Sequence, residues 1–473
     1  MFRLLRSQCL TLALLTLLAA TGLKAQPGLF ITTSNFETGS AALLAAGATE
    51  AEVNLLNLHS DSAVRYKQGR IYVINRFGQD NILVLDVNDP RTPLVQYSVG
   101  NGTNPQDIEI VSPSKAYVSR YESSEVLILN PQDGTELGVI DLSLFADADG
   151  TPEMTQMALW GSRLYVGLQR LHRDNGFIPS GQSLLAVIDT ETDALVDMDP
   201  STAGIQAWPL SATNPNDLVV AGNLLAVSQT AGFGDLEGGI EVLDLAAGTS
   251  RGLVVSEVDL EGDITALALV NSNLGYAIVS DASFNNHVKS VNLSTGAVGP
   301  ALAGHSGGFT SSLATDGQRL IVPDRGSFDD PNAAGLLIYD ANDGTLLAGP
   351  IATGLPPLSV AVLSDAAVIT AVDQAADTEP QSASLNAAYP NPFNASIAIP
   401  FTLEHADQSV ELTVYDLLGR KVRKLVSQSM TAGHHIVRWN GRDAQGITVG
   451  NGTYLIELHT GLLRTSQKVM LLK

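Results

Sequence analysis

Residues 107–134 read DIEIVSPSKAYVSRYESSEVLILNPQDG, three short apolar segments separated by turns rich in Ser, Pro, Asn, Asp and Gly. The first segment begins at a small polar residue, the second contains Tyr-Val, and the third ends in Leu-Asn. Short apolar segments between turn-forming residues are typical of β-strands. This stretch therefore predicts consecutive strands, and no helical periodicity of useful length competes with that interpretation.

The same pattern recurs between residues 55 and 370. Successive starts are 45, 48, 62, 48, 46 and 48 residues apart. A period of this length, with about four short strands in each unit, is typical of the blades of a β-propeller. One blade cannot bury both its faces alone, whereas radial stacking covers them. The seven starts are Ser62, Asp107, Thr155, Asp217, Thr265, Ser311 and Ser359.

The seventh unit, SVAVLSDAAVITAVD (359–373), lacks its later strands. The segment GLFITTSNFETGSAALLAAG (28–47) resembles the middle strands of a blade. We expect it to complete the last blade and to join the first blade to the last. Residues 26–373 are therefore predicted to form a seven-bladed β-propeller, in an all-β chain.

Charge divides the chain into two parts. Residues 26–384 carry a net charge of −29, whereas residues 385–473 carry +3. An acidic surface repels DNA, RNA and anionic lipid, so we expect no nucleic-acid partner. The charge either keeps an exported protein soluble or attracts cations and basic ligands.

The N-terminus has the pattern of a secretory signal peptide, predicted over residues 1–25. Arg3 and Arg6 precede the apolar stretch LTLALLTLLAA (10–20), which is too short for a permanent anchor. Cys9, the only cysteine, lies within this peptide, so the mature chain has no thiol chemistry. No other apolar run reaches membrane length, and we expect an exported protein without an integral membrane segment.

Beyond a small, polar linker predicted over residues 374–386, apolar residues alternate with a period of two. Ile397, Ile399, Phe401 and Leu403 show this alternation most clearly. About seven such short strands predict a compact immunoglobulin-like β-sandwich over residues 387–473. In YPNPFN (389–394) the two prolines hold the chain extended, and its aromatic residues are expected to pack on the sandwich edge.

This tail closely resembles the type A C-terminal sorting domain of the bacterial type IX secretion system and the related flagellar hook-cap immunoglobulin-like domain. The resemblance implies recognition of the tail by the type IX machinery at the outer membrane. Cleavage, with release or attachment at the cell surface, would follow. Ala395 departs from the family, which often has Pro there. The stretches that carry the resemblance are YPNPFN (389–394), VYDLLGRKVRKL (414–425), GHHIVRWNGRDAQG (433–446), GTYLIEL (452–458) and KVMLLK (468–473). The residues of the sorting motif are Tyr389, Pro390, Asn391, Pro392, Phe393 and Asn394.

The repeats carry a second resemblance. YVSRYESSEVLILNPQDGT (117–135) is similar to the Tyr-Val-Thr-Asn (YVTN) repeat of seven-bladed propellers, a superfamily that includes lactonase-like enzymes. It supports the fold and leaves the activity open, because propellers have many unrelated functions.

The first strand of each blade lines the central channel of a propeller. The seven starts would then surround one mouth of the channel as a ring that binds a small ligand or a cation. The alternative is that short polar residues cap strand ends and turns. His59 and His305 lie shortly before strand starts and could form an acid–base pair with Asp107, Asp217 or Glu109.

Calcium is the cofactor that the oxygen-rich loop ADADGTPE (146–153) suggests, with Asp147 and Asp149 as ligands. The loop departs from a calcium-binding loop, because its glycine comes two positions early and Ala158 stands where a bidentate Glu is needed. An exposed acidic loop is the alternative.

The sequence favours a non-enzymatic binding protein at the cell surface or outside the cell. Its alternatives are a secreted lactonase-like hydrolase with a site at the channel mouth and a structural surface-layer component. The long loops 170–182 and 229–239 are expected to contact a partner, because loops often carry binding function. Phe177, Phe233, Trp160 and Trp208 are the aromatic candidates for that contact, with core packing as the alternative.

Overall fold

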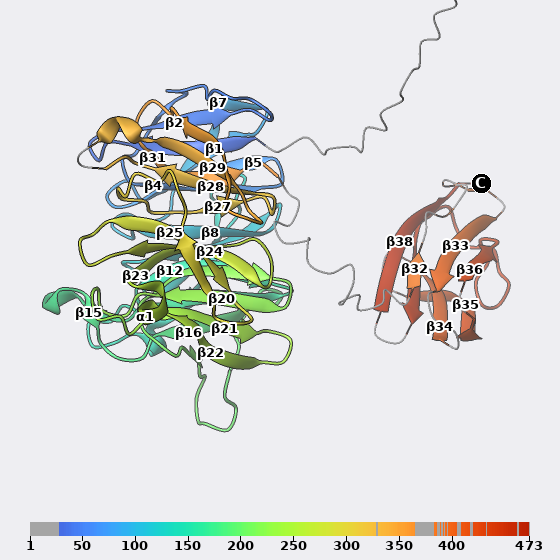
Figure 1. The fold of residues 1–473 in the computed structure, drawn as a ribbon. Helices are drawn as coiled ribbons and strands as arrows, with labels where there is room; N and C mark the ends of the chain where they lie inside the picture. Colours follow the sequence, from blue (N-terminus) through green and yellow to red (C-terminus); the bar gives the residue numbers. More distant parts are fainter. Residues whose placement is uncertain are drawn as a thin grey trace, which may run out of the picture. The chain divides into compact units, whose positions relative to one another are not determined.

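The computed structural model divides into two compact units between Ala371 and Val372 (Figure 1). The described residues are almost entirely β-strand and turn, which confirms the all-β prediction. The predicted signal peptide, residues 1–25, lies outside them. The structure describes residues 28–327, 330–364, 383–385, 388, 391, 393–394, 396–403, 408–416, 420–431, 433–460 and 463–472.

Within residues 28–327 and 330–364 the chain forms seven antiparallel sheets that each have four or five strands. From first to fourth strand, the first three are β4 (Ser62–Lys67), β5 (Arg70–Asn75), β6 (Asn81–Asp86), β7 (Asp89–Ser98); β8 (Pro105–Ser112), β9 (Lys115–Arg120), β10 (Glu125–Leu129), β11 (Glu136–Asp141); and β12 (Met154–Trp160), β13 (Arg163–Leu168), β16 (Leu184–Asp189), β17 (Ala194–Leu195), with β18 (Trp208–Pro209) beside β16. The next three are β19 (Pro215–Ala221), β20 (Leu224–Gln229), β21 (Gly239–Asp244), β22 (Thr249–Ser256); β23 (Asp263–Leu269), β24 (Leu274–Ser280), β25 (Asn286–Asn292), β26 (Val298–Ala301); and β27 (Ala314–Thr315), β28 (Arg319–Asp324), β29 (Gly335–Asp340), β30 (Leu346–Ile351).

The seventh sheet joins the two ends of this unit. Its first strand is β31 (Pro357–Val362), and the strands β1 (Leu29–Ser34), β2 (Gly39–Leu44) and β3 (Asn57–Leu58) follow in that spatial order. β1 pairs antiparallel with β31, with Ile31 opposite Val360. The segment 28–47 therefore supplies the two middle strands of the last sheet, and this part of the prediction is confirmed.

The first strands form a closed ring. β31 contacts β4, and each of β4, β8, β12, β19, β23 and β27 contacts the first strand of the next sheet, ending at β31. Sheets that stack radially around such a ring make a β-propeller. The middle strands are buried on both faces because neighbouring sheets cover them: the last five residues of β5 and the first five of β6 are all buried. The fourth strand β11 is mostly exposed, since it lies at the outer edge.

The end of the propeller at which the first strands begin is called the loop face here. In a four-stranded antiparallel sheet the loop between strands two and three and the link to the next sheet leave at the same end. β15 (Ile178–Pro179), from such a loop, and α1 (Glu257–Leu260), from such a link, accordingly lie on the same side in Figure 1. The loops are 35–38, 76–80, 121–124, 169–183, 230–238, 281–285 and 325–334, and the links are 59–61, 99–104, 142–153, 210–214, 257–262, 302–313 and 352–356.

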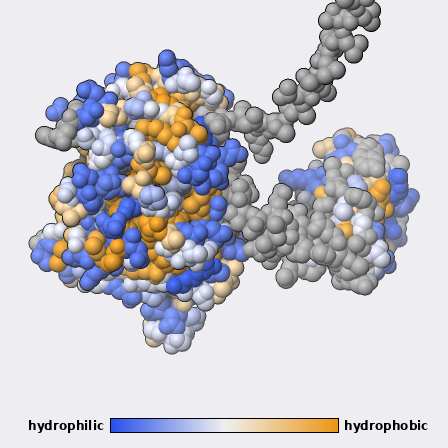
Figure 2. Space-filling view, in the orientation of Figure 1, coloured by the Kyte–Doolittle hydropathy of each residue, from blue (hydrophilic) through white to orange (hydrophobic). Residues whose placement is uncertain are grey.

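Three of these segments contain further short elements. They are η1 (Ser143–Phe145), η2 (Arg173–Asn175), η3 (Pro331–Ala333) and β14 (Leu171–His172), which pairs with β15. No helix in the described part of the chain is both long and apolar enough to cross a membrane. Figure 2 shows hydrophobic patches between hydrophilic areas on the visible side of the first unit.

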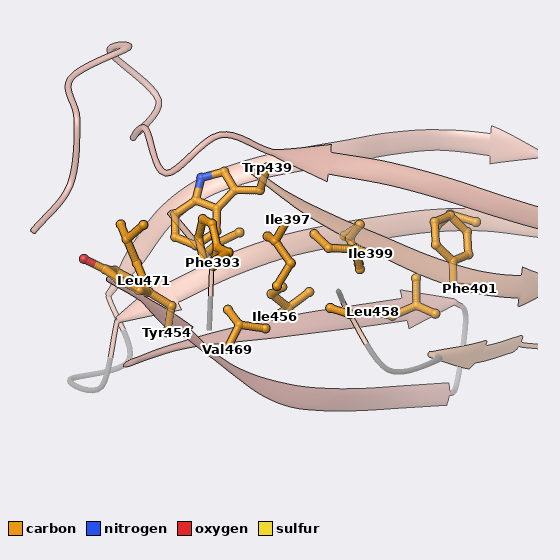
Figure 3. Close-up of a cluster of buried hydrophobic side chains, with 14 of the residues drawn as sticks. Phe393, Ile397, Ile399, Phe401, Trp439, Tyr454, Ile456, Leu458, Val469 and Leu471 are labelled. Carbon is orange, nitrogen blue, oxygen red and sulfur yellow. The ribbon is translucent and has the colours of Figure 1, made fainter. Parts of the chain in front are cut away.

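The second unit is a sandwich of two sheets, as the alternating pattern predicts. One sheet has the order β32-β33-β36 and the other β35-β34-β37-β38. Phe393, Trp439 and Ile456 lie in the core between them, with the Phe393 and Trp439 ring centroids 5.5 Å apart (Figure 3). The strands are β32 (Ala383–Leu385), β33 (Ile397–Leu403), β34 (Gln408–Asp416), β35 (Lys421–Met430), β36 (Gly433–Trp439), β37 (Gly452–Thr460) and β38 (Leu463–Leu471).

Two details of the tail differ from the sequence predictions. Ala383–Leu385, at the end of the predicted linker 374–386, forms β32 and pairs with β33. The other linker residues lie outside the described part. Phe393, expected on the sandwich edge, is instead buried in the core, because its backbone exchanges hydrogen bonds with Met470 and Leu472 of the terminal segment.

Candidate functional site

The seven predicted channel residues all lie at or just before the beginning of a first strand. Ser62, Asp107 and Thr155 are buried, and the other four are half-buried. Their placement matches the predicted positions in the repeat. The geometry around each one shows what its side chain does within the protein.

Asp107 ties three consecutive sheets together. Its fully buried carboxylate accepts two hydrogen bonds from the guanidinium of Arg65 on β4, at 2.7 and 3.0 Å. The same carboxylate accepts the backbone N–H of Met157 on β12 at 2.9 Å. A bidentate pair of this kind holds both side chains in a fixed geometry.

Asp217 repeats this arrangement two sheets later. Its carboxylate accepts the side-chain amide of Gln156 on β12 and the backbone N–H of Leu267 on β23, both at 2.6 Å. Met157 and Leu267 each lie two residues after a predicted start. Asp107 and Asp217 are therefore equivalent residues that bond to the sheet that follows them.

The hydroxyl members of the predicted ring are mixed in their bonding. The Ser311 hydroxyl donates to the carbonyl of Leu358 at 3.0 Å, which links β31 to the preceding sheet. The Thr155 hydroxyl donates to the Gly167 carbonyl at 3.4 Å, and the Ser359 N–H donates to the Thr32 hydroxyl at 3.2 Å. The ring thus contributes to the joints between blades, and its role as a ligand site stays a prediction.

Ser62 and Thr265 differ from these residues. Each has a buried hydroxyl oxygen without a hydrogen-bond partner among the described residues. Such groups are costly to bury unless they are satisfied. They mark the two positions at which the predicted ring retains unused polar capacity.

Charged groups gather in the channel around Arg65. Burial, with a smaller contribution from Asp107, raises the pKa of Glu109 on β8 to about 7. Burial likewise raises the pKa of Asp217 to about 6, although Leu267 and Arg65 oppose it. Burial alone would lower the pKa of Arg65, but the Asp107 carboxylate raises it above its ordinary value. Glu109 and Asp217 therefore titrate near neutral pH inside the channel.

The predicted histidine pairs have other partners. His59 Nδ1 lies 3.0 Å from the carbonyl of Asp61, and His305 Nε2 lies 2.9 Å from the hydroxyl of Thr310. Burial lowers the pKa of His305. The structure therefore gives neither imidazole a bond to Asp107, Asp217 or Glu109.

Asp147 and Asp149 stabilise turns in the link before β12. Asp147 accepts the N–H of Asp149 at 3.1 Å, and Asp149 accepts the N–H of Thr151 at 2.9 Å. Among the residues that the structure describes, no group of three or more His, Cys, Asp or Glu side chains is placed to hold a metal ion. Calcium binding by Asp147 and Asp149 stays a prediction.

Arg173 fixes the base of the long loop 169–183. It donates to the buried carboxylate of Glu153 at 3.0 Å and forms a close ion pair with Glu122 on the neighbouring loop. Its guanidinium also lies 5.8 Å from the ring centroid of Tyr121. The loop is thereby tied at its start to the preceding sheet, while Phe177 beyond it remains exposed.

The loop face carries an unusual set of aromatic side chains. Every exposed phenylalanine among the described residues lies on it, each 52–72% exposed. Exposed apolar residues that gather on one face mark interaction surfaces, whereas single ones need no explanation. These residues are Phe36, Phe77, Phe177, Phe233, Phe284 and Phe309.

Four of these rings form two pairs across neighbouring sheets. Phe233 and Phe284 are stacked, with centroids 5.8 Å apart and an interplanar angle of 7°. Phe36 and Phe309 are tilted, with centroids 6.5 Å apart. Phe36, Phe177 and Phe284 have φ angles of 72°, 59° and 61°, a left-handed conformation that is costly for a bulky residue. The fold thus holds these rings outward at an energetic cost.

A surface hollow of about 550 Å³ lies in the fifth sheet, next to the loop that carries Phe284. Three carboxylates line it: Asp259 and Glu261 at the link 257–262, and Asp281 in the loop 281–285. Hydrogen bonds from His287 to Asp281, from Lys289 to Glu261 and from Ser256 to Asp259 lower the pKa of each carboxyl. All three are therefore charged at neutral pH.

Comparison with known families gives one match. Residues 392–461 match the model of the FlgD Ig-like domain. No curated protein matches the chain. The match agrees with the two-sheet sandwich seen in the second unit.

Several solved structures resemble the chain. PorZ of Porphyromonas gingivalis, an essential bacterial surface component of the type IX secretion system, has 14% identity and a TM-score of 0.44. That similarity covers 92% of this chain and 63% of PorZ, so the chain spans less than two thirds of PorZ. The β-propeller domain of Cps50 (Swd1) from Myceliophteria thermophila has 10% identity and a TM-score of 0.43, over 70% of this chain and 98% of Cps50. Hsv2 of Kluyveromyces lactis has 11% identity and a TM-score of 0.37, over 77% of this chain and 99% of Hsv2.

The sequence predictions missed the most distinctive parts of both regions. Arg65 and Gln156 were not identified as partners of the two aspartates. The aromatic face was anticipated only at Phe177 and Phe233, which are exposed, whereas Trp160 and Trp208 are half-buried against the core as the alternative held. A phenylalanine recurs in the second-to-third-strand loops, for example NRFG (75–78), AGFG (231–234) and ASFN (282–285). An alignment of these loops would have revealed it.

Proposed function

We propose that this protein is an exported, non-enzymatic binding protein. The seven sheets of the first unit act as the seven blades of a propeller that presents a recognition surface. The C-terminal sandwich acts as a sorting domain that the type IX secretion machinery recognises. The mature protein functions outside the cell or at the outer-membrane surface.

The aromatic loop face is the observation that carries the binding function. Six exposed phenylalanines converge there from different sheets, and three of them have a costly backbone conformation. The charged cluster in the channel has less freedom to act on a ligand, because Asp107 is committed to Arg65 and to Met157. Side chains that project into solvent from a rigid scaffold are suited to contact a partner.

The tail motifs support delivery through type IX secretion. Tyr389, Pro390 and Pro392 lie outside the described residues. Asn391 donates to the carbonyl of Lys468 at 3.1 Å and accepts the N–H of Met470 at 2.8 Å, which joins the motif to the last strand. Asn394 is exposed. The motif and the terminal KVMLLK thus form one structural element that a receptor can recognise as a unit.

A reporter fusion tests the delivery. Residues 383–473 are attached to a periplasmic reporter in a host with a type IX system, and the reporter is measured in the medium and on intact cells. The proposal predicts that the reporter leaves the periplasm and that a Trp439→Ala fusion, which loses the sandwich core, stays behind. A reporter that remains periplasmic with the intact tail contradicts it.

A lactonase-like hydrolase is the alternative function, and one observation favours it. Glu109, with a pKa raised to about 7, is suited to proton transfer at neutral pH, and Arg65 lies close to it. Hydrolysis of simple lactones by the purified chain, abolished by Glu109→Gln, would support this alternative. Activity that survives Glu109→Gln would exclude Glu109 as its base.

A further inference from the structure

The stacked pair Phe233–Phe284 and the acidic hollow are parts of one surface. Phe284 and Asp281 belong to the same five-residue loop, and Asp281 lines the hollow. Phe233 comes from the preceding sheet, and Val258, 65% exposed, lies beside Asp259 in α1. Apolar groups and a charged recess therefore lie within a few residues of each other.

The other aromatic pair on this face shows what covers such rings. The guanidinium of Arg325 lies 4.3 Å from the centroid of Phe36, which in turn contacts Phe309. Arg325 also donates to the carbonyl of Ser34 at 2.8 Å, so its position is fixed. Among the described residues, no cation lies over Phe233 or Phe284 in the same way.

The charges of the hollow favour a cationic group. Lys289 neutralises Glu261 at 2.8 Å, which leaves Asp259 and Asp281 facing a single imidazole, His287. The arginines of the loop face are engaged elsewhere: Arg76 with Asp61, Arg173 with Glu153, and Arg325 with backbone carbonyls. Carboxylates bind guanidinium and ammonium groups strongly, and aromatic faces attract the same cations.

We propose that this surface, formed by Phe233, Phe284 and the hollow, binds a polypeptide segment in which arginine or lysine alternates with large apolar residues. The basic side chain enters the hollow, and an apolar neighbour packs on the exposed rings. The net charge of −29 over residues 26–384 attracts such a segment over a longer range. This inference rests on the proposed binding function and specifies the chemistry of the partner.

Binding of a model peptide by the purified full chain tests the proposal. The probe is a fluorescently labelled twelve-residue peptide of three arginine–leucine–glycine–serine repeats. Two further probes replace its arginines by glutamate or its leucines by serine. We expect saturable binding of the first peptide, binding at least tenfold weaker for the other two, and weaker binding as salt is raised.

Variants of the surface give the second readout. Phe233→Ser with Phe284→Ser, and separately Asp281→Asn, should each weaken binding at least fivefold. Asn at position 281 can still accept the turn N–H groups of Ser283 and Asn285, which keeps the loop folded. The control changes Glu136→Gln and Leu137→Ser on the exposed edge strand β11 and should leave binding unchanged.

Three results would overturn the proposal: no binding of the arginine–leucine peptide, equal binding of the glutamate peptide, or undiminished binding by the surface variants. Failure here is distinct from failure of the proposed function. The reporter fusion measures delivery, and loss of other loop-face contacts, such as Phe77→Ser, measures binding away from the hollow.

Discussion

Replacing Glu109 by Gln should stabilise the protein in a pH-dependent way. Burial raises the pKa of Glu109 from 4.5 to about 7, so the folded state holds its proton more tightly than the unfolded chain. As the pH rises from about 4.5 through about 7, the folded protein must ionise a poorly solvated carboxyl and loses stability. A shift of this size corresponds to roughly 3 kcal/mol, at about 1.4 kcal/mol for each pKa unit.

Gln has nearly the same shape as protonated Glu and cannot ionise, so the variant avoids this loss. At pH 8 the variant should be more stable than wild type by up to about 3 kcal/mol, and near pH 4 the two should be equal. Urea unfolding followed by circular dichroism, at both pH values, gives the difference. Glu37→Gln, at an exposed position on the loop face, is the control and should show no such pH dependence.

The reasoning about the channel would be refuted by a Glu109→Gln variant that equals wild type at pH 8. A variant less stable than wild type at pH 8 would show instead that attraction to Arg65 and Lys67 exceeds the cost of burial. In either case Glu109 would be an ordinary ionised carboxylate, and the hydrolase alternative would lose its only support.

Three further predictions concern the joints of the fold. Asp107→Asn should destabilise the protein by about 2–4 kcal/mol in urea unfolding, reduced from the fully buried case because the Arg65 side chain is 40% exposed, whereas Asp86→Asn should cost less than about 1 kcal/mol. Phe30→Ala, in the closing strand β1, should cost about 3–5 kcal/mol, and exposed Phe77→Ala less than about 0.5 kcal/mol; similar losses for both would contradict the closure. Arg173→Met should leave Glu153 without its cationic partner and speed limited proteolysis within residues 170–182, while Arg170→Met, which loses a bond to the Gln182 carbonyl, should have a smaller effect; equal cleavage rates would count against Arg173 as the anchor.

The repeat could be predicted from the sequence because each blade contains its own local signal. Period-two apolar segments and turn residues recur within each unit, and the incomplete last unit pointed to residues 28–47. The same locality explains why Asp107 and Asp217 were recognised as equivalent positions. The C-terminal sandwich was predictable for the same reason.

The contacts that give these residues their properties are long-range and left no local signal. Arg65 and Asp107 are 42 residues apart, and Gln156 and Asp217 are 61 apart. Their pairing depends on how neighbouring blades pack, as does the burial that raises the pKa of Glu109. The hollow combines a link with a loop and two strands of the fifth sheet. Only the assembled propeller brings these segments together.

The measurement that tests the account most directly is the location of the full chain and of a chain truncated after Ser364, in cells with a type IX system. Surface labelling and protease treatment of intact cells, with fractionation of the periplasm and medium, distinguish the outcomes. The account predicts that the full chain yields propeller outside the cell, whereas the truncated chain accumulates in the periplasm. Export of the truncated chain to the same extent, or retention of the full chain, would contradict it.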